Sequence, residues 1–291
     1  MTLELPTDPV EMLRGVLALD DTGARTSNDI FVGASHPMPS GRVFGGQVLA
    51  QAVMAATRTL PPERHPHSLH GYFLRPGDVR GPITFAVDRV HDGRSFSRRR
   101  IQAYQEGVPI FSGIASFQDD DPGFEHHLPM PDVPAPEDLP DPTQLHVDHP
   151  QSGLLLRANP IEVRHTTGDI WLHVDEPSPY QAVWTRVRGP LGDDPALHRA
   201  ALAYLSDFTI QEPVMRAGGV AWSDPGVKTA SLDHAIWWHR FARVDEWLLY
   251  VQESPSSQGG RGLSLGRLYT RDGVLVATVA QEIMLRVPDR A

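Results

Sequence analysis

The sequence carries the same pattern twice. Residues Thr229–Arg240 read TASLDHAIWWHR, and a weaker copy at His67–Asp78 reads HSLHGYFLRPGD. After each copy come two alternating apolar segments joined by a hairpin with glycine at its tip, Gly107 in the first half and Gly273 in the second. The tip glycine follows the serine of its copy by 39 positions in the first half and by 42 in the second. A repeat of this length indicates a duplicated domain and not the short units of a solenoid.

Each half is expected to contain one long helix followed by a run of strands. In the first half the apolar spacing predicts a short helix at 8–17, a strand at 30–32, a long helix that begins at Gly41, and strands at 69–74, 83–90, 97–104 and 108–117. In the second half it predicts strands at 161–164, 170–174 and 182–188, a helix from Pro195 to Phe208, and strands that begin at Leu232, Trp247, Leu263 and Val274. This order is typical of an α+β protein in which each antiparallel sheet curls around its own helix. The two sheets are then expected to pair edge to edge.

Residues 121–145 differ in composition from the rest of the chain. They hold seven prolines and a cluster of acidic residues. Such a segment is expected to be an interdomain linker that forms no packed element. The full length of 291 residues fits two domains of ordinary size. The predicted division is therefore 1–120, 121–145 and 146–291.

Composition excludes several classes of function. The net charge of -10 argues against nucleic acid or an anionic membrane as a partner. The chain has no cysteine, which excludes disulfides, thiolate metal sites and a cysteine nucleophile. Its first residues, MTLELPTDPVEML, lack the pattern of a signal peptide. No uninterrupted run of apolar residues is long enough for a membrane-spanning helix. A cytoplasmic enzyme or binding protein is the expectation.

A glutamine interrupts the apolar face of the last predicted strand. Gln281 falls on the face shared by Leu275, Ala277, Val279, Ile283 and Leu285. A buried amide without a partner costs about 1–3 kcal/mol, so either another polar group meets Gln281 or the strand bulges there. The register of the repeat puts Ala115 at the equivalent place in the first half. A functional role and a structural hydrogen bond to backbone both stay open for Gln281.

Two more polar residues of the second half could share a site with Gln281. In the predicted helix, Ala200, Ala203 and Asp207 fall at positions i, i+3 and i+7, a narrow face of small residues that ends in a carboxylate. Spacing alone favours a solvated Asp207 near a helix end, and Ser231 by itself is one hydroxyl among many. Together, a carboxylate, a hydroxyl and an amide can hold and activate one water molecule.

Six segments follow one another along the chain: VFGGQVLAQA (43–52), HSLHGYFLRPGD (67–78), AYLSDF (203–208), SLDHAIWWHR (231–240), EWLLY (246–250) and DGVLVATVAQE (272–282). They closely resemble acyl-CoA thioesterase II, the TesB-type thioesterases. The resemblance covers nearly the whole chain apart from the linker and the termini. It implies an α+β fold of two tandem hotdog domains, each an antiparallel sheet wrapped around a long central helix.

The resemblance also implies a reaction. That family hydrolyses fatty acyl-CoA thioesters with an oriented water, without a metal, a cofactor or a covalent intermediate. By motif its Asp, its Thr or Ser, and its Gln correspond to Asp207 in LSDF, Ser231 in SLDH and Gln281 in VAQE. Asp207 is then expected to accept a proton from the water while Ser231 and Gln281 position it. Better-known members have Thr where this chain has Ser231, which lacks the methyl group that restricts the rotamer.

Three further residues are candidates for contacts with the substrate. Gly46 and Gln47 follow Gly45 at the start of the first long helix, and the backbone N–H groups of this helix start can stabilise charge on a carbonyl oxygen. Gly45 and Gly46 equally suit a helix that packs closely against a strand. Arg261, in a flexible loop, can meet the phosphates of CoA, although a lone surface arginine is more often solvated.

Other readings of single motifs are weaker. Gly262–Gly266 matches G-x-S-x-G, but a serine nucleophile at Ser264 needs a strand followed by a helix, and two strands are predicted here. Two histidine groups suggest metal binding: His65, His67 and His70, and Asp233, His234 and His239. Neither has the spacing of a known ligand set.

Two alternative functions stay open beside hydrolysis. One is a noncatalytic protein of the same fold that binds or senses acyl-CoA. The other is a hotdog enoyl-CoA hydratase, for which no Asp and His pair with the required spacing is found. The sequence leaves acyl-chain preference and oligomeric state open, a homo-oligomer included.

Overall fold

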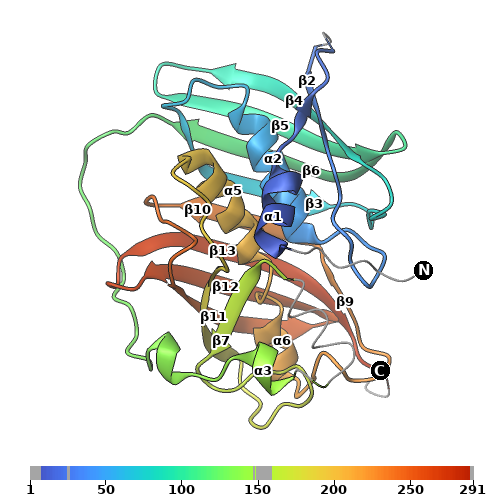
Figure 1. Ribbon diagram of the computed structural model, residues 1–291, viewed down its shortest axis with the longest axis vertical. Coiled ribbons are helices and arrows are strands. Elements are labelled where there is room, and N and C mark those ends of the chain that lie inside the picture. Colours follow the sequence, from blue (N-terminus) through green and yellow to red (C-terminus); the bar gives the residue numbers. More distant parts are fainter. Residues whose placement is uncertain (1–7, 25–26, 147, 149–158, 289–291) are drawn as a thin grey trace.

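A computed structural model describes residues 8–24, 27–146, 148 and 159–288. Within these residues the strands form one 13-stranded antiparallel sheet that runs through both halves of the chain (Figure 1). Its order is β1-β2-β4-β5-β6-β3-β10-β13-β12-β11-β8-β7, and β9 pairs with β13 beside this path. No helix among the described residues is long and apolar enough to cross a lipid bilayer.

The first half contains two helices and six strands. They are α1 Pro9–Leu17, α2 Gly45–Thr57, β1 Asp20–Asp21, β2 Asp29–Gly33, β3 His65–Phe73, β4 Ile83–Asp92, β5 Phe96–Gln105 and β6 Val108–Gln118. Asp8 caps α1, accepting a hydrogen bond of 2.8 Å from Val10 N–H, and Pro9 is its first residue. The expected start of the long helix at Gly41 is wrong, because Phe44 still has an extended backbone and serves as the N-cap of α2.

The second half repeats this plan with additions. It contains β7 Ile161–His165, β8 Tyr180–Val187, α5 Pro195–Ser206, α6 Glu212–Ala217, β9 Lys228–Ser231, β10 Asp233–Trp238, β11 Leu248–Gln258, β12 Arg261–Thr270 and β13 Leu275–Arg286. The strand expected at 170–174 is wrong, since this segment is a loop. Its buried Ile170 packs with Met215 and Val220 around α6, so the apolar spacing reflects a loop anchored under a helix. Neither α6 nor β9 was expected.

The two halves join along β3 and β10. These strands pair antiparallel, with Leu69 opposite Ile236 and Gly71 opposite His234. The expected edge-to-edge pairing of the two sheets is therefore confirmed. The strands that join are the two copies of the repeated motif.

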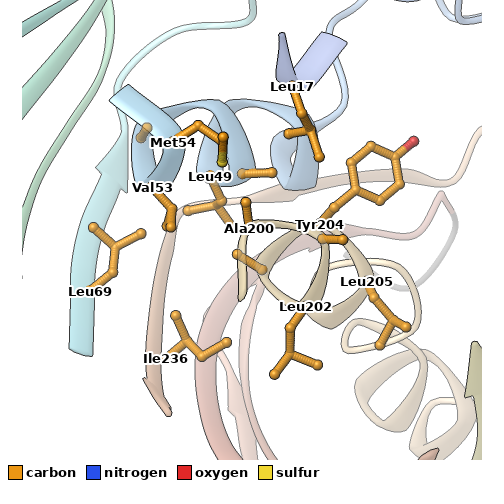
Figure 2. Close-up of a cluster of buried hydrophobic side chains, with 14 of the residues drawn as sticks. Leu17, Leu49, Val53, Met54, Leu69, Ala200, Leu202, Tyr204, Leu205 and Ile236 are labelled. Carbon is orange, nitrogen blue, oxygen red and sulfur yellow. The ribbon is translucent and has the colours of Figure 1, made fainter. Parts of the chain in front are cut away.

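The core lies between the sheet and the paired helices α2 and α5. All residues from Gly46 to Ala56 of α2 are buried, because sheet lies on one side of the helix and α5 on the other. Figure 2 shows Leu49 and Val53 of α2 beside Ala200 of α5, with Leu69 and Ile236 in the same cluster. Small residues let the helices approach closely.

The segment 121–145, here called the linker strap, does pack, so the expectation of no packed element is wrong. It crosses from the first half to the second along one side of the molecule (green in Figure 1) and includes the short helices η1 Pro136–Asp138 and α3 Pro142–Leu145. Met130, Val133 and Leu139 cover an apolar cluster on the second half of the sheet. Trp184 Nε1 also donates a hydrogen bond of 2.8 Å to Pro134 O. Prolines prevent a regular ladder, but they leave the side chains free to cover an apolar face.

Candidate active site

The site forms where β13 changes its strand partner. Up to Ala280 this strand pairs with β10, and from Ile283 it pairs with β9, where Ser231 lies opposite Ile283. Between the two stretches the N–H of Glu282 donates to the side chain of Asp233 at 2.7 Å. This break in the ladder separates β9 from β10 and places Ser231 beside Gln281.

The structure brings Asp207, Ser231 and Gln281 together. The Ser231 hydroxyl donates to Asp207 Oδ1 at 3.2 Å, and Gln281 Nε2 donates to Ser231 Oγ at 2.9 Å. Asp207 is the C-cap residue of α5 and is 2% exposed, so the reading of a solvated carboxylate is wrong. Gln281 is fully buried, and polar partners meet it without a bulge, since β12 and β13 pair in unbroken register around it.

Burial sets the electrostatics of Asp207. Loss of solvent raises the pKa of its carboxyl group to about 6. Hydrogen bonds from Gln281, Ser231 and the backbone N–H of Gly46 act in the opposite direction and limit the rise of this pKa. The group is therefore mostly ionised at neutral pH and still within reach of protonation.

The amino end of α2 approaches Asp207 so closely that only glycine fits there. A Cβ at Gly45 would lie 2.7 Å from Asp207 Oδ2, and a Cβ at Gly46 would lie 2.4 Å from the carbonyl oxygen of Tyr204. The glycine pair thus permits the approach of α2 to α5, and it also brings the N–H of Gly46 to the carboxylate. The packing role considered for these glycines is confirmed, and stabilisation of a carbonyl oxygen stays a prediction.

The other two candidates lie away from these groups. The Gln47 side chain is buried, accepts from His36 N–H at 3.2 Å and donates to Ala34 O at 3.2 Å. Arg261 is exposed and pairs with Glu282 at 3.0 Å. Neither residue lines the cavity described next.

A cavity of about 950 Å³ opens beside Asp207 and Ser231 and is lined by both halves of the chain. Its lining includes six aromatic residues: Phe44, Phe73, Trp171, Tyr204, Phe208 and Trp222. The exposed cations Arg42, Arg75 and Lys228 also line it, and among the described residues none of the three forms an ion pair with a carboxylate. An apolar cavity with a few polar groups and a cationic rim suits a molecule that is apolar at one end and anionic at the other.

Sequence reasoning missed two polar neighbours of Ser231 and Gln281. Gln211 Nε2 donates to Ser231 Oγ at 3.1 Å from the loop before α6. His234 Nδ1 contacts Gln281 Oε1, and this histidine is 1% exposed. The alternation of β10 could have indicated an inward His234, whereas Gln211 follows a helix end and gave no periodic signal.

The structure does not provide the context that the weaker motifs require. Ser264 is fully buried in the middle of β12, with no helix after it, so the context of a nucleophile elbow is absent. Over the residues placed by the structure, no group of three His, Asp or Glu side chains could hold a metal ion. That includes both histidine groups considered from the sequence.

Comparison with known proteins identifies the relatives of this chain. Residues 34–118 match the family model described as the acyl-CoA thioesterase N-terminal domain, and residues 130–285 match the acyl-CoA thioesterase C-terminal domain. The chain is 37% identical to human acyl-coenzyme A thioesterase 8, an alignment that covers 96% of this chain and 92% of that protein. It is 36% identical to acyl-CoA thioesterase 2 of Haemophilus influenzae, over 88% and 92% of the two chains.

A solved structure agrees with these sequence relatives. The acyl-CoA thioesterase II TesB2 of Mycobacterium marinum superposes with a TM-score of 0.76 and 38% identity, covering 96% of this chain and 99% of that one. The two family models together span most of the chain, and the fold is the double hotdog expected from the sequence. The protein therefore belongs to the acyl-CoA thioesterase II family, with two tandem hotdog domains.

Proposed function

We propose that this protein hydrolyses acyl-CoA thioesters at a single site with a water molecule that Asp207 activates. The observation that carries the proposal is the hydrogen-bonded cluster of Asp207, Ser231 and Gln281, of which Asp207 and Ser231 line a large apolar cavity. The family to which the chain belongs supports the same reaction.

Asp207 is suited to act as the general base. Its Oδ1 accepts from Ser231, while its Oδ2 faces Gly45, where no side chain intervenes. A water bound at Oδ2 would give its proton to the carboxylate as its oxygen bonds to the thioester carbonyl carbon. When the C–S bond breaks, Asp207 returns this proton to the departing thiolate, so the products are a carboxylic acid and CoA.

The developing charge on the carbonyl oxygen needs donors near the cavity. The amino end of α2 supplies them, since Gly45 lines the cavity beside Asp207 and the helix dipole is positive there. The N–H of Gly46 is directed to Asp207, and that of Gln47 donates to Phe44 O at 3.1 Å. We therefore place the stabilising donor at Gly45, the first residue of the helix start considered from the sequence.

The anionic end of CoA fits the cationic rim. Arg42, Arg75 and Lys228 line the cavity, are exposed and have no carboxylate partner within the described part of the chain, so their charges can meet phosphates. Arg261 neither lines the cavity nor lacks a partner. The rim residues take over the role first considered for Arg261.

Thiol release from a panel of short, medium and long acyl-CoAs tests the proposal. The chain has no cysteine, so a thiol reagent reports only the CoA released. Asp207→Ala should lower kcat by about 10²–10⁴-fold. Asp272→Ala, at an exposed hairpin tip, serves as the matched control.

Two outcomes would contradict the proposal in different ways. Unchanged turnover in folded Asp207→Ala would remove Asp207 from the mechanism. No release from folded wild-type protein across the panel would favour a noncatalytic acyl-CoA-binding protein, which calorimetry with intact acyl-CoA would detect. Cytoplasmic location and a homo-oligomeric state stay predictions, to be checked by fractionation and light scattering.

A further inference from the structure

We propose that His234 is a positioning residue of this site: it holds the carboxamide of Gln281 with its oxygen turned away from Asp207 and its nitrogen turned toward Ser231. The inference rests on the proposed function in that Gln281 must matter for turnover. It adds a residue outside the Asp207–Ser231–Gln281 cluster to the working site.

The contacts of His234 form a continuous chain to the carboxylate. Its Nδ1 meets Gln281 Oε1, and its Nε2 lies 3.0 Å from Ser206 Oγ. Gln281 Nε2 in turn donates to Ser231 Oγ, which donates to Asp207 Oδ1. The ring of His234 thus connects the last turn of α5 to the side chains around Asp207.

The protonation of His234 decides the direction of these hydrogen bonds. Burial lowers the pKa of the imidazole to about 4, so the ring is neutral at neutral pH and has one donor and one acceptor. A carboxamide oxygen only accepts, so Nδ1 carries the hydrogen that Gln281 Oε1 receives. Nε2 is then the acceptor nitrogen of the ring, and it lies beside the Ser206 hydroxyl, which donates to Ala203 O at 2.9 Å. The reversed carboxamide would turn its oxygen toward the ionised Asp207 and remove donors from a buried charge.

The duplicated half gives an independent argument. The equivalents of His234 and Gln281 in the first half are Gly71 and Ala115, and Gly71 lies directly opposite His234 in the sheet. A Cβ at Gly71 would lie 2.3 Å from the Phe111 ring, so the space of the imidazole is filled there by an aromatic residue. The histidine and the glutamine are present together in the half that carries Asp207 and absent together in the other.

A double-mutant cycle separates positioning from mere packing. His234→Leu should lower kcat about tenfold to a hundredfold with little change in KM, because the buried Gln281 oxygen loses its donor. His234→Asn should retain most of the activity, because its amide N–H can replace Nδ1–H. In the Gln281→Ala background, either change should have almost no further effect, because the residue through which His234 acts is gone.

Controls keep the test decisive. His239→Leu removes a histidine of the same motif whose ring lies outside and contacts Thr278, and it should leave kcat unchanged. If His234→Leu fails to fold, the cycle is run with His234→Ala and Gln281→Ala, since alanine also removes the donor to Gln281. Additive losses, or equal losses in the Leu and Asn variants, would overturn the positioning role.

Nitrogen-15 spectra of the histidine rings supply a readout that needs no turnover. His234, assigned by comparison with His234→Asn, should be neutral and protonated on Nδ1 at pH 7, and Gln281→Ala should change this tautomer. An Nε2–H tautomer that does not respond to Gln281→Ala would overturn the inference. Wild-type protein that releases no thiol would instead count against the proposed function.

Discussion

Asp207 is both deeply buried and well supplied with hydrogen-bond donors, and the balance between the two sets the pKa on which its proposed role as a base depends. Burial alone favours the neutral acid, whereas hydrogen bonds from Ser231, Gln281 and Gly46 favour the carboxylate. The resulting pKa of about 6 leaves most molecules ionised at neutral pH. It also lies near the operating pH, where a general base transfers protons most effectively.

The pH dependence of turnover follows from this pKa. As the pH falls through about 6, Asp207 takes up a proton and can no longer accept one from water. We expect kcat/KM at pH 5 to be about one tenth of its value at pH 8. Initial rates of thiol release between pH 4.5 and 8.5, with folding checked at each pH, measure this. A rate that stays flat down to pH 5 would contradict Asp207 as the base.

The same group should make the protein less stable as the pH rises. The folded-state pKa of Asp207 is raised from 3.8 to about 6, so the folded protein holds the proton more tightly than the unfolded chain does. Its ionisation therefore costs stability between these values, and the full cost is present above about pH 6. Asp207→Asn removes that cost, so its free energy of unfolding relative to wild type should increase from pH 4 to pH 8, by about 3 kcal/mol at most. Urea unfolding at both pH values tests the sign, and a difference that shrinks with pH would refute it.

At the scale of elements, the close approach of α2 to α5 places the amino end of α2 against Asp207. We expect Gly46→Ala to destabilise the fold by about 1–3 kcal/mol and to lower kcat, since a Cβ there would meet the Tyr204 carbonyl oxygen and the Phe44 ring, both at 2.4 Å. Gly15→Ala in the exposed part of α1 is the control, because nothing lies within 4 Å of its Cβ. It should stabilise the protein by about 0.5–1 kcal/mol. Thermal unfolding of both variants checks the pair, and a Gly46→Ala protein as stable as wild type would show that the helices have room.

Local pattern made most elements predictable, and non-local contacts account for the errors. Alternation predicted β13 and the inward Gln281, and the duplication predicted that the two sheets pair edge to edge. The loop at 170–174 has the apolar spacing of a strand because Ile170 is buried under α6. Local spacing cannot report this contact. The expectation that the linker strap forms no packed element came from its composition. Composition does not report the apolar face of the sheet that the strap covers.

The candidate site shows the same limit. Helical spacing placed Asp207 near the end of α5 but could not show that α2 would cover it. The family resemblance, and not spacing, selected Asp207, Ser231 and Gln281. Gln211 contacts Ser231 from the loop before α6, and His234 contacts Gln281 from β10, and both contacts depend on how distant segments pack in three dimensions.

At the scale of the molecule, neither half could form this site alone. The second half supplies Asp207, Ser231 and Gln281, and the first half supplies the amino end of α2 and part of the cavity wall. The division into 1–120, 121–145 and 146–291 stays a prediction. The packed linker strap suggests that part of 121–145 belongs with the second half, in line with the family match that begins at residue 130.

The charge distribution of the whole molecule leads to a prediction about the CoA end of the substrate. The chain has a net charge of -10, but the cations that line the cavity give this region a local positive charge that attracts an anionic ligand. Lys228→Gln should raise KM for acyl-CoA about threefold to tenfold, the effect of losing one charged hydrogen bond, and leave kcat nearly unchanged. Arg261→Gln, which also removes one exposed cation but lies outside the cavity lining, should change neither constant. The difference should vanish with an acyl-N-acetylcysteamine thioester, which has no phosphates. An equal rise of KM in both variants would show that only the overall charge of the protein matters. A rise of KM for the phosphate-free substrate would show that Lys228 acts on the acyl end.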